Sequence, residues 1–525
     1  MAVPLSYQVT ITVNLASAGI TRAGFGVPLV LSNTGNAWST PELTRTYTTG
    51  SFAGDFPAGT VENLILTQLF AQGTGLQTVK VGKGTNKPTL TKTLTVSSAV
   101  SGQAYQINVT SGGTAWQAIY TAGGGDTTST IATALAAALG GTAWLASTAY
   151  SLGNHVKNGG NVYVCTAAGT SAASGGPTGT GANIHDGSGT LYWAYVGASN
   201  FSASATGAVV TCAGSAAGNW FALEPIASGD AAAVSNLMVL LDTTTDPGVA
   251  TDLATIAGAD NAWYGLIIPF KSSAIVGNSN GSGVSGWSVA NGKLFGCSMS
   301  DTACATAAYS TGATDSLAQL TQLGNSLTFG QFHPRDAQFL EACTFGYFLP
   351  AQPGTDNWCN KSLSNVTPVD YTPTQLTNLL GRRAGFYSTE GGINILLGNG
   401  QVEDTTYAYI DTRRNVDYYA TNLQADLVNL FIQNTKIANT NAGRALFRQA
   451  IANRNNISIT QGIISGDPLA PAATPPTMTP YVVYVPDVSV AGSFNPATRA
   501  LSGASTNWKL AGAIDSIGVT VNITQ

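Results

Sequence analysis

Tyr264-Gly-Leu-Ile-Ile-Pro-Phe270 is the stretch that decides the fold class. Its apolar residues follow one another without the polar alternation of a half-exposed strand, which predicts a strand buried on both faces, as in parallel sheets. Asn236-Leu-Met-Val-Leu-Leu-Asp242 has the same character, and a helix is predicted between Pro247 and Gly258. The strand–helix–strand order predicts an α/β core.

Further helix and strand patterns extend this core in both directions. Upstream, Thr60 is the predicted N-cap of a helix that reaches Phe70, and a strand follows at 78–82. Downstream, helices are predicted at 316–323, 334–343, 374–382, 417–434 and 441–453, and strands at 293–298, 327–332, 393–398 and 481–485. The sequence therefore alternates helices with strands over most of its second half.

The composition changes near residue 90, where the chain becomes rich in Thr, Ser, Ala and Gly. Segments 105–110 and 115–120 predict a hairpin, and 129–139 predicts a short helix. The strand expected to complete this unit comes only at 208–212, so a separate module is predicted between them. Aromatic residues crowd that module and predict a small β-fold closed by aromatic packing: Trp144, Tyr150, Tyr163, Tyr192, Trp193 and Tyr195.

The predicted organisation is an α+β or α/β multidomain chain of 525 residues, long enough for roughly three domains. Its parts are an N-terminal arm (1–20), a first part of the core (21–89), a β-rich middle domain (90–143 and 198–229), an inserted β-module (144–197), the main α/β core (230–465), a Pro-rich linker (466–480), and C-terminal core strands with an arm (481–525). Both arms are predicted to be extended strands with alternating apolar residues: Tyr7, Val9, Ile11 and Val13, and Val519, Val521 and Ile523.

Composition excludes several classes of function. Charged residues make up 9% of the chain, where about 25% is usual, and the formal net charge is −5. Without clustered Lys and Arg, direct nucleic-acid binding is not expected. No apolar run is long enough to span a membrane, and no secretory signal is expected, which predicts synthesis in the cytoplasm. A surface so poor in charge suits a protein covered by copies of itself.

No motif predicts catalysis, a metal or a cofactor, so the chain is not expected to be an enzyme. Gly286 to Lys293 fails the phosphate-loop spacing, and Asn291-Gly292 is better explained as a hairpin turn. Glu403, Asp404 and Asp411 are expected to form ion pairs with neighbouring arginines, and His333 a structural hydrogen bond. Six cysteines without metal spacing are expected to be buried reduced thiols: Cys165, Cys212, Cys297, Cys304, Cys343 and Cys359.

Eight of the 21 cations lie between Arg382 and Arg454. They form either an ordinary solvated helix face or a charged contact surface between subunits. The residues considered for inter-subunit contacts are Arg382, Arg383, Arg413, Arg414, Arg444 and Arg448.

The order of landmarks resembles the sheath proteins of contractile phage tails. Four pieces carry the resemblance: Val3-Pro-Leu-Ser-Tyr-Gln-Val-Thr-Ile-Thr-Val13 with Gly24-Phe-Gly-Val-Pro-Leu-Val30; Tyr47-Thr-Thr-Gly-Ser-Phe-Ala-Gly-Asp-Phe56 with the helix and strand after it; Ala408-Tyr-Ile-Asp411 before the long helix, with Asn441-Ala-Gly443 beyond; and Arg499 with Leu510-Ala-Gly-Ala-Ile514. The module is similar to chitin-binding modules of chitinases, with Trp144, Gly153, Gly160, Pro177 and Trp193 among the matching positions.

The resemblance implies a sheath-type core and a self-assembling structural subunit of a virion tail. Such a subunit would stack in helical rings around a tail tube, between a baseplate and a tail terminator, join its neighbours through terminal strand arms, and contract to drive the tube through the host envelope for genome delivery. In the module it implies contact with host surface glycans through Trp144, Tyr150, Tyr163 and Trp193. A tail tube or other virion protein, and a carbohydrate-binding surface adhesin, are the alternatives.

Overall fold

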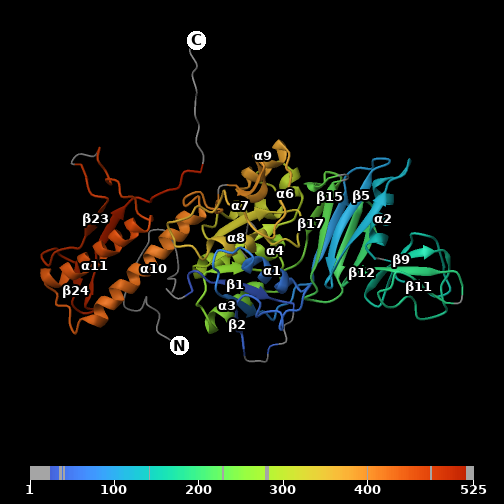
Figure 1. The fold of residues 1–525 in the computed structure, drawn as a ribbon. Coiled ribbons are helices and arrows are strands. Elements are labelled where there is room, and N and C mark those ends of the chain that lie inside the picture. Colours follow the sequence, from blue (N-terminus) through green and yellow to red (C-terminus); the bar gives the residue numbers. More distant parts are fainter. Residues whose placement is uncertain are drawn as a thin grey trace, which may run out of the picture.

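The computed structural model describes residues 24–34, 38, 42–140, 142–187, 189–227, 230–277, 283–398, 400–472 and 476–515. The arm residues Tyr7 to Val13 and Val519 to Ile523 lie outside this part of the chain. The described elements form a mixed α/β multidomain fold, as predicted from the sequence. Figure 1 shows a central α/β core between a β-rich domain with its outer module on one side and a long helical hairpin on the other.

The core is built on one eight-stranded sheet in the order β2-β3-β1-β18-β19-β20-β21-β22. All pairings from β3 to β21 are parallel, and β2 and β22 add antiparallel edges. The inner strands β1, β18, β19 and β20 are buried along their whole length, because both sheet faces are covered. The bounds are β1 Pro28–Ser32, β2 Thr44–Tyr47, β3 Val79–Lys83, β18 Gly265–Ile267, β19 Leu294–Met299, β20 Thr328–Phe332, β21 Gly385–Glu390 and β22 Ile393–Leu397.

Helices follow the strands of this sheet much as the sequence predicts. They are α1 Val61–Phe70, α3 Val249–Ala259, α4 Ser273–Val276, α5 Val284–Asn291, α6 Ala303–Thr306, α7 Ser316–Leu323, α8 Leu340–Phe348 and α9 Pro373–Gly381. The Thr60 side chain caps α1 by accepting from the Asn63 N–H, which confirms the predicted N-cap. The predicted bounds 417–434 and 441–453 are too short, because the structure has helices at Ile410–Gln433 and Asn441–Thr460. Two further predictions are wrong. α8 begins at Leu340 rather than 334, and Gly292 ends helix α5 in a left-handed conformation instead of closing a hairpin.

The middle domain consists of two four-stranded antiparallel sheets, β13-β14-β4-β17 and β16-β15-β5-β6, with helix α2 packed on them. Its hairpin β5–β6 confirms the prediction. The stretch 236–242, predicted as a parallel core strand, instead becomes β17 and pairs antiparallel with β4. The bounds are β4 Thr91–Val96, β5 Ala104–Ser111, β6 Thr114–Thr121, α2 Thr128–Ala138, β13 Phe201–Thr206, β14 Val209–Gly214, β15 Phe221–Ala227, β16 Asp230–Val234 and β17 Met238–Asp242.

The predicted insertion, residues 144–197, is a separate small β-fold at the far end of the middle domain, and we call it the outer module (Figure 1). It contains a four-stranded sheet, β11-β12-β9-β8, and the pair β7–β10. Six side chains form its own apolar centre: Tyr150, Val156, Tyr163, Cys165, Leu191 and Trp193. The bounds are β7 Ala149–Tyr150, β8 His155–Asn158, β9 Asn161–Ala167, β10 Gly169–Thr170, β11 Ile184–His185 and β12 Tyr192–Ala198.

The opposite end of the molecule is an antiparallel pair of long helices, α10 Ile410–Gln433 and α11 Asn441–Thr460 (Figure 1). Two small sheets complete this end, β23 (Tyr481–Tyr484) with β26 (Ser505–Trp508), and β24 (Phe494–Asn495) with β25 (Ala500–Leu501). We call residues 410–510 the helical-hairpin end. It has its own apolar cluster, which includes Tyr419, Leu423, Ile451, Ile463 and Val485.

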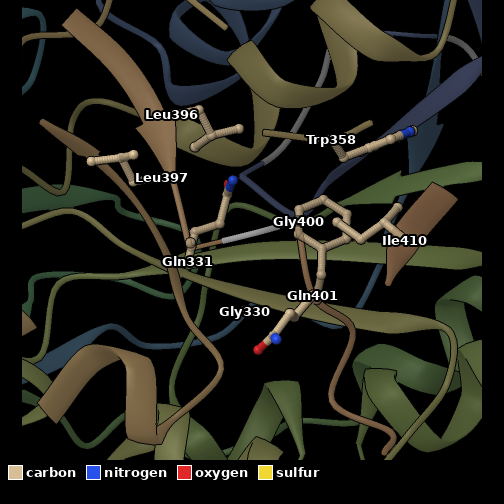
Figure 2. A pocket seen from close by; sticks show the side chains of 10 residues that line it. Gly330, Gln331, Trp358, Leu396, Leu397, Gly400, Gln401 and Ile410 are labelled. Carbon is tan, nitrogen blue, oxygen red and sulfur yellow. The ribbon is translucent and has the colours of Figure 1, made fainter. Parts of the chain in front are cut away.

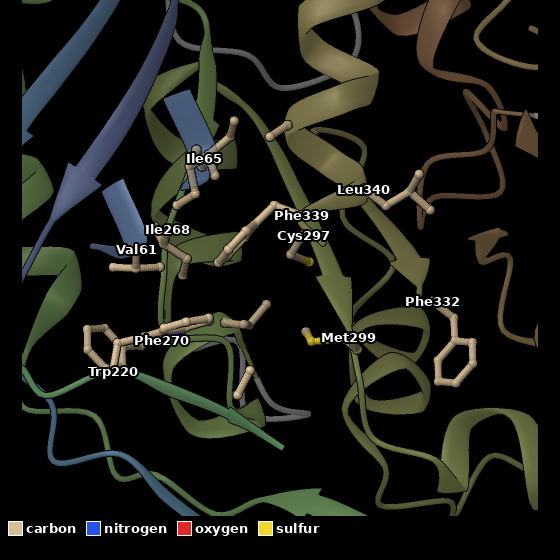
Figure 3. Close-up of a cluster of buried hydrophobic side chains, with 14 of the residues drawn as sticks. Val61, Ile65, Trp220, Ile268, Phe270, Cys297, Met299, Phe332, Phe339 and Leu340 are labelled. Carbon is tan, nitrogen blue, oxygen red and sulfur yellow. The ribbon is translucent and has the colours of Figure 1, made fainter. Parts of the chain in front are cut away.

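The middle domain and the main sheet share one apolar core. Trp220 from the middle domain lies 5.8 Å from the ring of Phe339, which precedes α8. Figure 3 shows Trp220, Phe339 and Ile268 in the same cluster as Met299 at the end of β19. These two parts are therefore packed as one body, because a continuous buried surface opposes their separation.

The tightest backbone approach between these parts is a glycine pair, which gives a first prediction. Gly59 has φ +90°, and a Cβ built on it would lie 2.2 Å from the Gly113 Cα in the β5–β6 turn. Gly59→Ala combines left-handed strain of about 1–2 kcal/mol with a backbone clash, so we expect it to lower the free energy of unfolding by about 3 kcal/mol. Gly50→Ala is the control, because Gly50 has φ +78° and open space around it. Equal losses in urea unfolding would contradict the packing argument.

Candidate functional site

The carboxyl ends of β19 and β20 form the first candidate site, because open α/β sheets ordinarily bind ligands at this edge. Here the edge meets the middle domain. Lys92 on β4 pairs with Asp336, and Glu224 on β15 accepts the Ala337 N–H at 3.3 Å. The Leu240 N–H on β17 donates to the Thr302 hydroxyl at 2.9 Å. We call Lys92, Glu224, Asp242, Asp301 and Asp336 the seam cluster, since it lies between the two domains.

Burial dominates the electrostatics of the seam cluster. It raises the pKa of Glu224 to about 7 and that of Asp301 to about 7. Burial alone would lower the pKa of Lys92, but the carboxylates of Asp336 and Asp242 outweigh it, and the pKa is raised. Sequence analysis missed this cluster. One sequence pattern could have indicated it. Lys92 alternates in register with Leu94 and Val96, which face inward, and an inward-facing lysine requires a buried partner of opposite charge.

The arginines considered for contacts between subunits are mostly satisfied inside the chain. Arg382 is fully buried, and its guanidinium donates to both carboxylate oxygens of Asp315, at 2.9 and 2.7 Å. Arg413 pairs with Asp417 at 2.8 Å, and both side chains are 1% exposed. These paired charges lie in the interior of one subunit rather than on a surface between subunits.

The other four of these arginines bind backbone carbonyl groups. Arg414 is buried, which lowers its pKa to about 10, and it donates to the carbonyl oxygens of residues 348, 349 and 351. Arg444 is buried and donates to the Pro486 carbonyl at 2.8 Å, while the half-buried Arg383 donates to that of Val402 at 2.8 Å. Arg448 alone of the six is exposed, with its guanidinium on the Val485 carbonyl at 3.1 Å.

Glu403 and Asp411 have different surroundings, and the expected ion pairs with neighbouring arginines are absent from the described part of the chain. Glu403 is 2% exposed, accepts the Gly330 N–H at 3.1 Å and keeps its second oxygen without a partner. Burial raises its pKa to about 8, whereas burial and Asp515 raise that of Asp411 to about 6. The nearby cavity in Figure 2, lined by Gly330, Gln331 and Trp358 among others, measures about 10 Å³, room for at most one water molecule.

Glu403 gives a pH prediction. Because its folded pKa is about 8 and its unfolded value about 4.5, the folded state binds the extra proton, and stability falls as pH rises from about 4 to 8. Glu403→Gln removes this loss, so we expect the variant to gain on the order of 4 kcal/mol over the parent at pH 8 and little at pH 5. Urea unfolding at both pH values measures the difference. Exposed Glu390→Gln is the control, and parallel pH curves for the parent and Glu403→Gln would contradict the burial argument.

The aromatic residues predicted to contact glycans mainly form the interior of the module. Tyr163 and Trp193 are fully buried, and Tyr150 is 8% exposed. Trp144 is half-buried, with Gly176 so near that an added Cβ would lie 2.8 Å from its ring. Buried Asp186 accepts both indole N–H groups, from Trp144 at 2.7 Å and Trp193 at 2.9 Å. These rings have little free face on which a sugar could stack.

Asp186 gives a local stability prediction. Asp186→Ala leaves the buried Trp193 indole N–H without a partner, at about 1–3 kcal/mol, and also removes the acceptor of the half-buried Trp144 indole. We therefore expect the module to open more readily than the rest of the chain. Hydrogen exchange should rise in peptides from 144–197 and stay unchanged in the main sheet. Asn183→Ala, at an exposed position, is the control. Unchanged exchange in the module would show that Asp186 does not hold the two tryptophans.

The second candidate site is the β23–β26 sheet at the helical-hairpin end. It has two strands, and the described residues add no third strand to either edge. One face packs on α10 and α11 through Val483 and Trp508, whose ring lies 4.9 Å from that of Tyr419. The other face exposes Val482 and Tyr484, at 40% and 50%. Open edges and exposed apolar side chains together make this a surface able to accept another strand.

Apolar exposure extends from this sheet along the same end of the molecule. Ile432 is 73% exposed and Phe431 41%, near the turn between α10 and α11. Leu446, Ile457, Val488 and Val490 on neighbouring segments are each 40–46% exposed. We call these residues, with Val482 and Tyr484, the apolar end surface. Exposed apolar side chains at one end of a chain are a feature of surfaces that bind other proteins.

The remaining predicted residues have structural surroundings. His333 is buried between the carbonyls of Arg335 and Thr367, and burial lowers its pKa to about 4, so the ring is neutral. All six cysteines are buried and free, as predicted. Within the described ranges, no group of three or more His, Cys, Asp or Glu side chains is arranged to hold a metal ion. No helix in that part of the chain is long and apolar enough to cross a membrane.

Comparison with known proteins gives low similarity. No family model matches the sequence, and neither does any curated protein. Among solved structures, the fold is similar to the sheath tail protein of Desulfitobacterium hafniense, with 10% identity and a TM-score of 0.39 over 91% of this chain and 93% of that chain. It is also similar to a chain of the anti-feeding prophage baseplate, with 14% identity and a TM-score of 0.37 over 53% of this chain and 73% of that chain. Because these scores are low, the function is inferred from the chain's own residues.

Proposed function

We propose that this chain is a structural subunit of a contractile tail sheath, which polymerises helically around a tail tube. The observation that carries the proposal is the two-stranded β23–β26 sheet with open edges and an exposed apolar face. A two-stranded sheet is marginal by itself, and a strand from a neighbour would complete it through backbone hydrogen bonds. The same end of the molecule carries the apolar end surface, which a neighbouring copy would bury.

The terminal arms supply strands of the required chemistry. Tyr7, Val9, Ile11 and Val13 alternate with polar residues, as do Val519, Val521 and Ile523. A strand with this pattern places its apolar side chains on one face, where Val482 and Tyr484 of a neighbour would meet them. The C-terminal arm begins beside Asp515, whose carboxylate accepts from the Asn357 side chain at 2.7 Å. That bond anchors the base of the arm to the core.

The distribution of charge supports assembly from many copies. Of the eight ion pairs among the described residues, four have both side chains no more than 8% exposed, so much of the small number of charges is used inside the subunit. The surface left over is dominated by uncharged polar and apolar groups. Such faces approach one another without strong like-charge repulsion, which favours a lattice of identical subunits.

Contraction would follow from two alternative packings of the same subunit faces, without a cofactor or nucleotide. The arms would keep neighbours joined during the change, while the main sheet and the middle domain move as one packed body. In this role the subunit would be a virion tail component, with the tail tube inside the polymer and a baseplate and tail terminator at its ends.

Arm exchange makes a direct prediction. Removing residues 2–13 or 516–525, or introducing Val482→Glu on the exposed sheet face, should leave a folded subunit that no longer forms tubes, because each change removes or blocks the added strand. Negative-stain electron microscopy and sedimentation, with purified tail tube as a template, measure assembly. Leu152→Glu is the matched control, because Leu152 is 71% exposed on the outer module. Normal tubes from all three variants would exclude arm exchange.

The outer module should be dispensable for assembly. Ala143 pairs with Lys157, Lys157 with Val162, and Val162 with Gly197, so the module's two ends lie three strand spacings apart, about 14 Å. A linker of about six Gly and Ser residues spans that gap in place of 144–197. We expect tubes of normal pitch with a smaller outer diameter. A folded but non-assembling variant would show that the module takes part in subunit contacts.

A further inference from the structure

Lys92 and Asp336 are in direct contact inside the seam cluster, although 244 residues separate them in the sequence. The lysine is 2% exposed and the aspartate 8%. Lys92 comes from β4 of the middle domain, whereas Asp336 lies between β20 and α8 of the main core. An amine and a carboxyl group are thus held together, away from bulk water, across the contact between two domains.

A second carboxyl group is held beside the residue that follows Asp336. Glu224 is 7% exposed, and its Oε1 is held by the N–H of Ala337, the residue that follows Asp336. Burial raises its pKa to about 7, so a large fraction of Glu224 carries a proton at neutral pH. A buried carboxyl group poised between its two protonation states is suited to accept a proton and return it.

We propose that Lys92 and Asp336 become joined by an amide bond between Nζ and Cγ, and that Glu224 assists by transferring protons. The reaction needs no oxidant, reductant or co-reactant. Lys92 loses two hydrogens from nitrogen, Asp336 loses one carboxyl oxygen, and one water molecule leaves. The product is neutral, so two buried charges disappear in the same step.

The order of proton movements follows from the environment. The ammonium first gives a proton to the Asp336 carboxylate. This transfer is unfavourable, because the opposite charges around the pair outweigh burial, raising the pKa of Lys92 and lowering that of Asp336. The neutral amine then attacks Cγ while Glu224 takes its second proton. Glu224 returns that proton to the departing hydroxyl group, which leaves as water. Asp242 and Asp301 also face Lys92 and favour its charged form, so we expect a slow reaction after folding.

The direct contact between the amine and the carboxyl group should raise the rate of the reaction. Groups held against each other in a rigid site react as though each were present at a very high concentration. The resulting bond would lock the middle domain onto the carboxyl edge of the main sheet. It would close a loop of 244 residues, and so would oppose separation of the two domains under mechanical load. The inference does not depend on the proposed sheath function.

A second buried pair in the same protein is a matched comparison. Lys271 lies 3.0 Å from Glu341, and their exposed fractions are 5% and 0%. The Lys271 ammonium also contacts the Ser298 hydroxyl at 3.2 Å and stands 4.3 Å from the centre of the Phe339 ring. The aromatic ring stabilises the charged amine, which is the unreactive form. We therefore expect Lys271 to remain unlinked.

Intact-mass spectrometry of the denatured full-length protein tests the proposal. We expect the parent to be lighter, by the mass of one water molecule, than the value derived from the Lys92→Arg variant after correction for the substitution. Tryptic digestion should yield a branched peptide that joins the segments around residues 92 and 336, with no cleavage after Lys92. Peptides that contain Lys271 and Glu341 should be unbranched.

The variants separate the bond from the role of Glu224. Glu224→Gln keeps the size of the side chain and should leave a folded protein in which the linked fraction grows at least tenfold more slowly. A parent protein of full mass after prolonged incubation at neutral pH would overturn the proposal, as would a branch at any other pair. Equal linking rates in the parent and Glu224→Gln would overturn the assigned role of Glu224.

Discussion

The parallel pairing of β1 with β18 is the constraint on which the rest of the structure depends. Pro28, Leu29 and Val30 lie opposite Gly265, Leu266 and Ile267, and this contact joins the N-terminal strands to the remainder of the sheet. The middle domain and the outer module lie between β3 and α3 in the sequence. This pairing places β1 and β3 beside the strands from the second half, and the packing of α1 on α8 supports it.

That pairing in turn requires close packing on one sheet face. A Cβ on Gly265 would lie 2.8 Å from Leu349, just after α8, and 3.2 Å from Phe345 on that helix. The absence of a side chain lets the helix lie directly on the central strand. Because interiors are as dense as organic crystals, the glycine and the two large side chains act as one fitted unit. The close fit at Gly265 therefore holds α8 against β18 at the centre of the main sheet.

Charged side chains usually lie on the surface of a protein, but several of the ion pairs in this structure are buried. Arg382 with Asp315 and Arg413 with Asp417 are buried, and so are the lysine pairs at the carboxyl edge. Buried ion pairs add little net stability compared with apolar packing, but a misplaced partner is costly. They therefore specify how the segments meet. The open β23–β26 sheet and the apolar end surface are left as the faces through which copies would associate.

Local patterns in the sequence determined most elements of this fold. Continuous apolar runs identified β18, β19 and β20, the alternation at 105–120 identified the β5–β6 hairpin, and Thr60 identified the start of α1. These features depend on residues near one another in the chain. The outer module was also recognisable, because its aromatic residues pack mainly among themselves.

Tertiary structure alone decided which distant segments meet. The run at 236–242 has the composition of a parallel core strand, yet it pairs with β4, because pairing depends on the neighbour available and not on the strand's own residues. Arg382 and Arg413 looked like surface charges, but their partners lie inside. For the same reason, the inward-facing Lys92 could indicate a buried partner but not which residues form the seam cluster. Lys92, Glu224 and Asp336 are far apart in sequence, and only the docking of two domains brings them together.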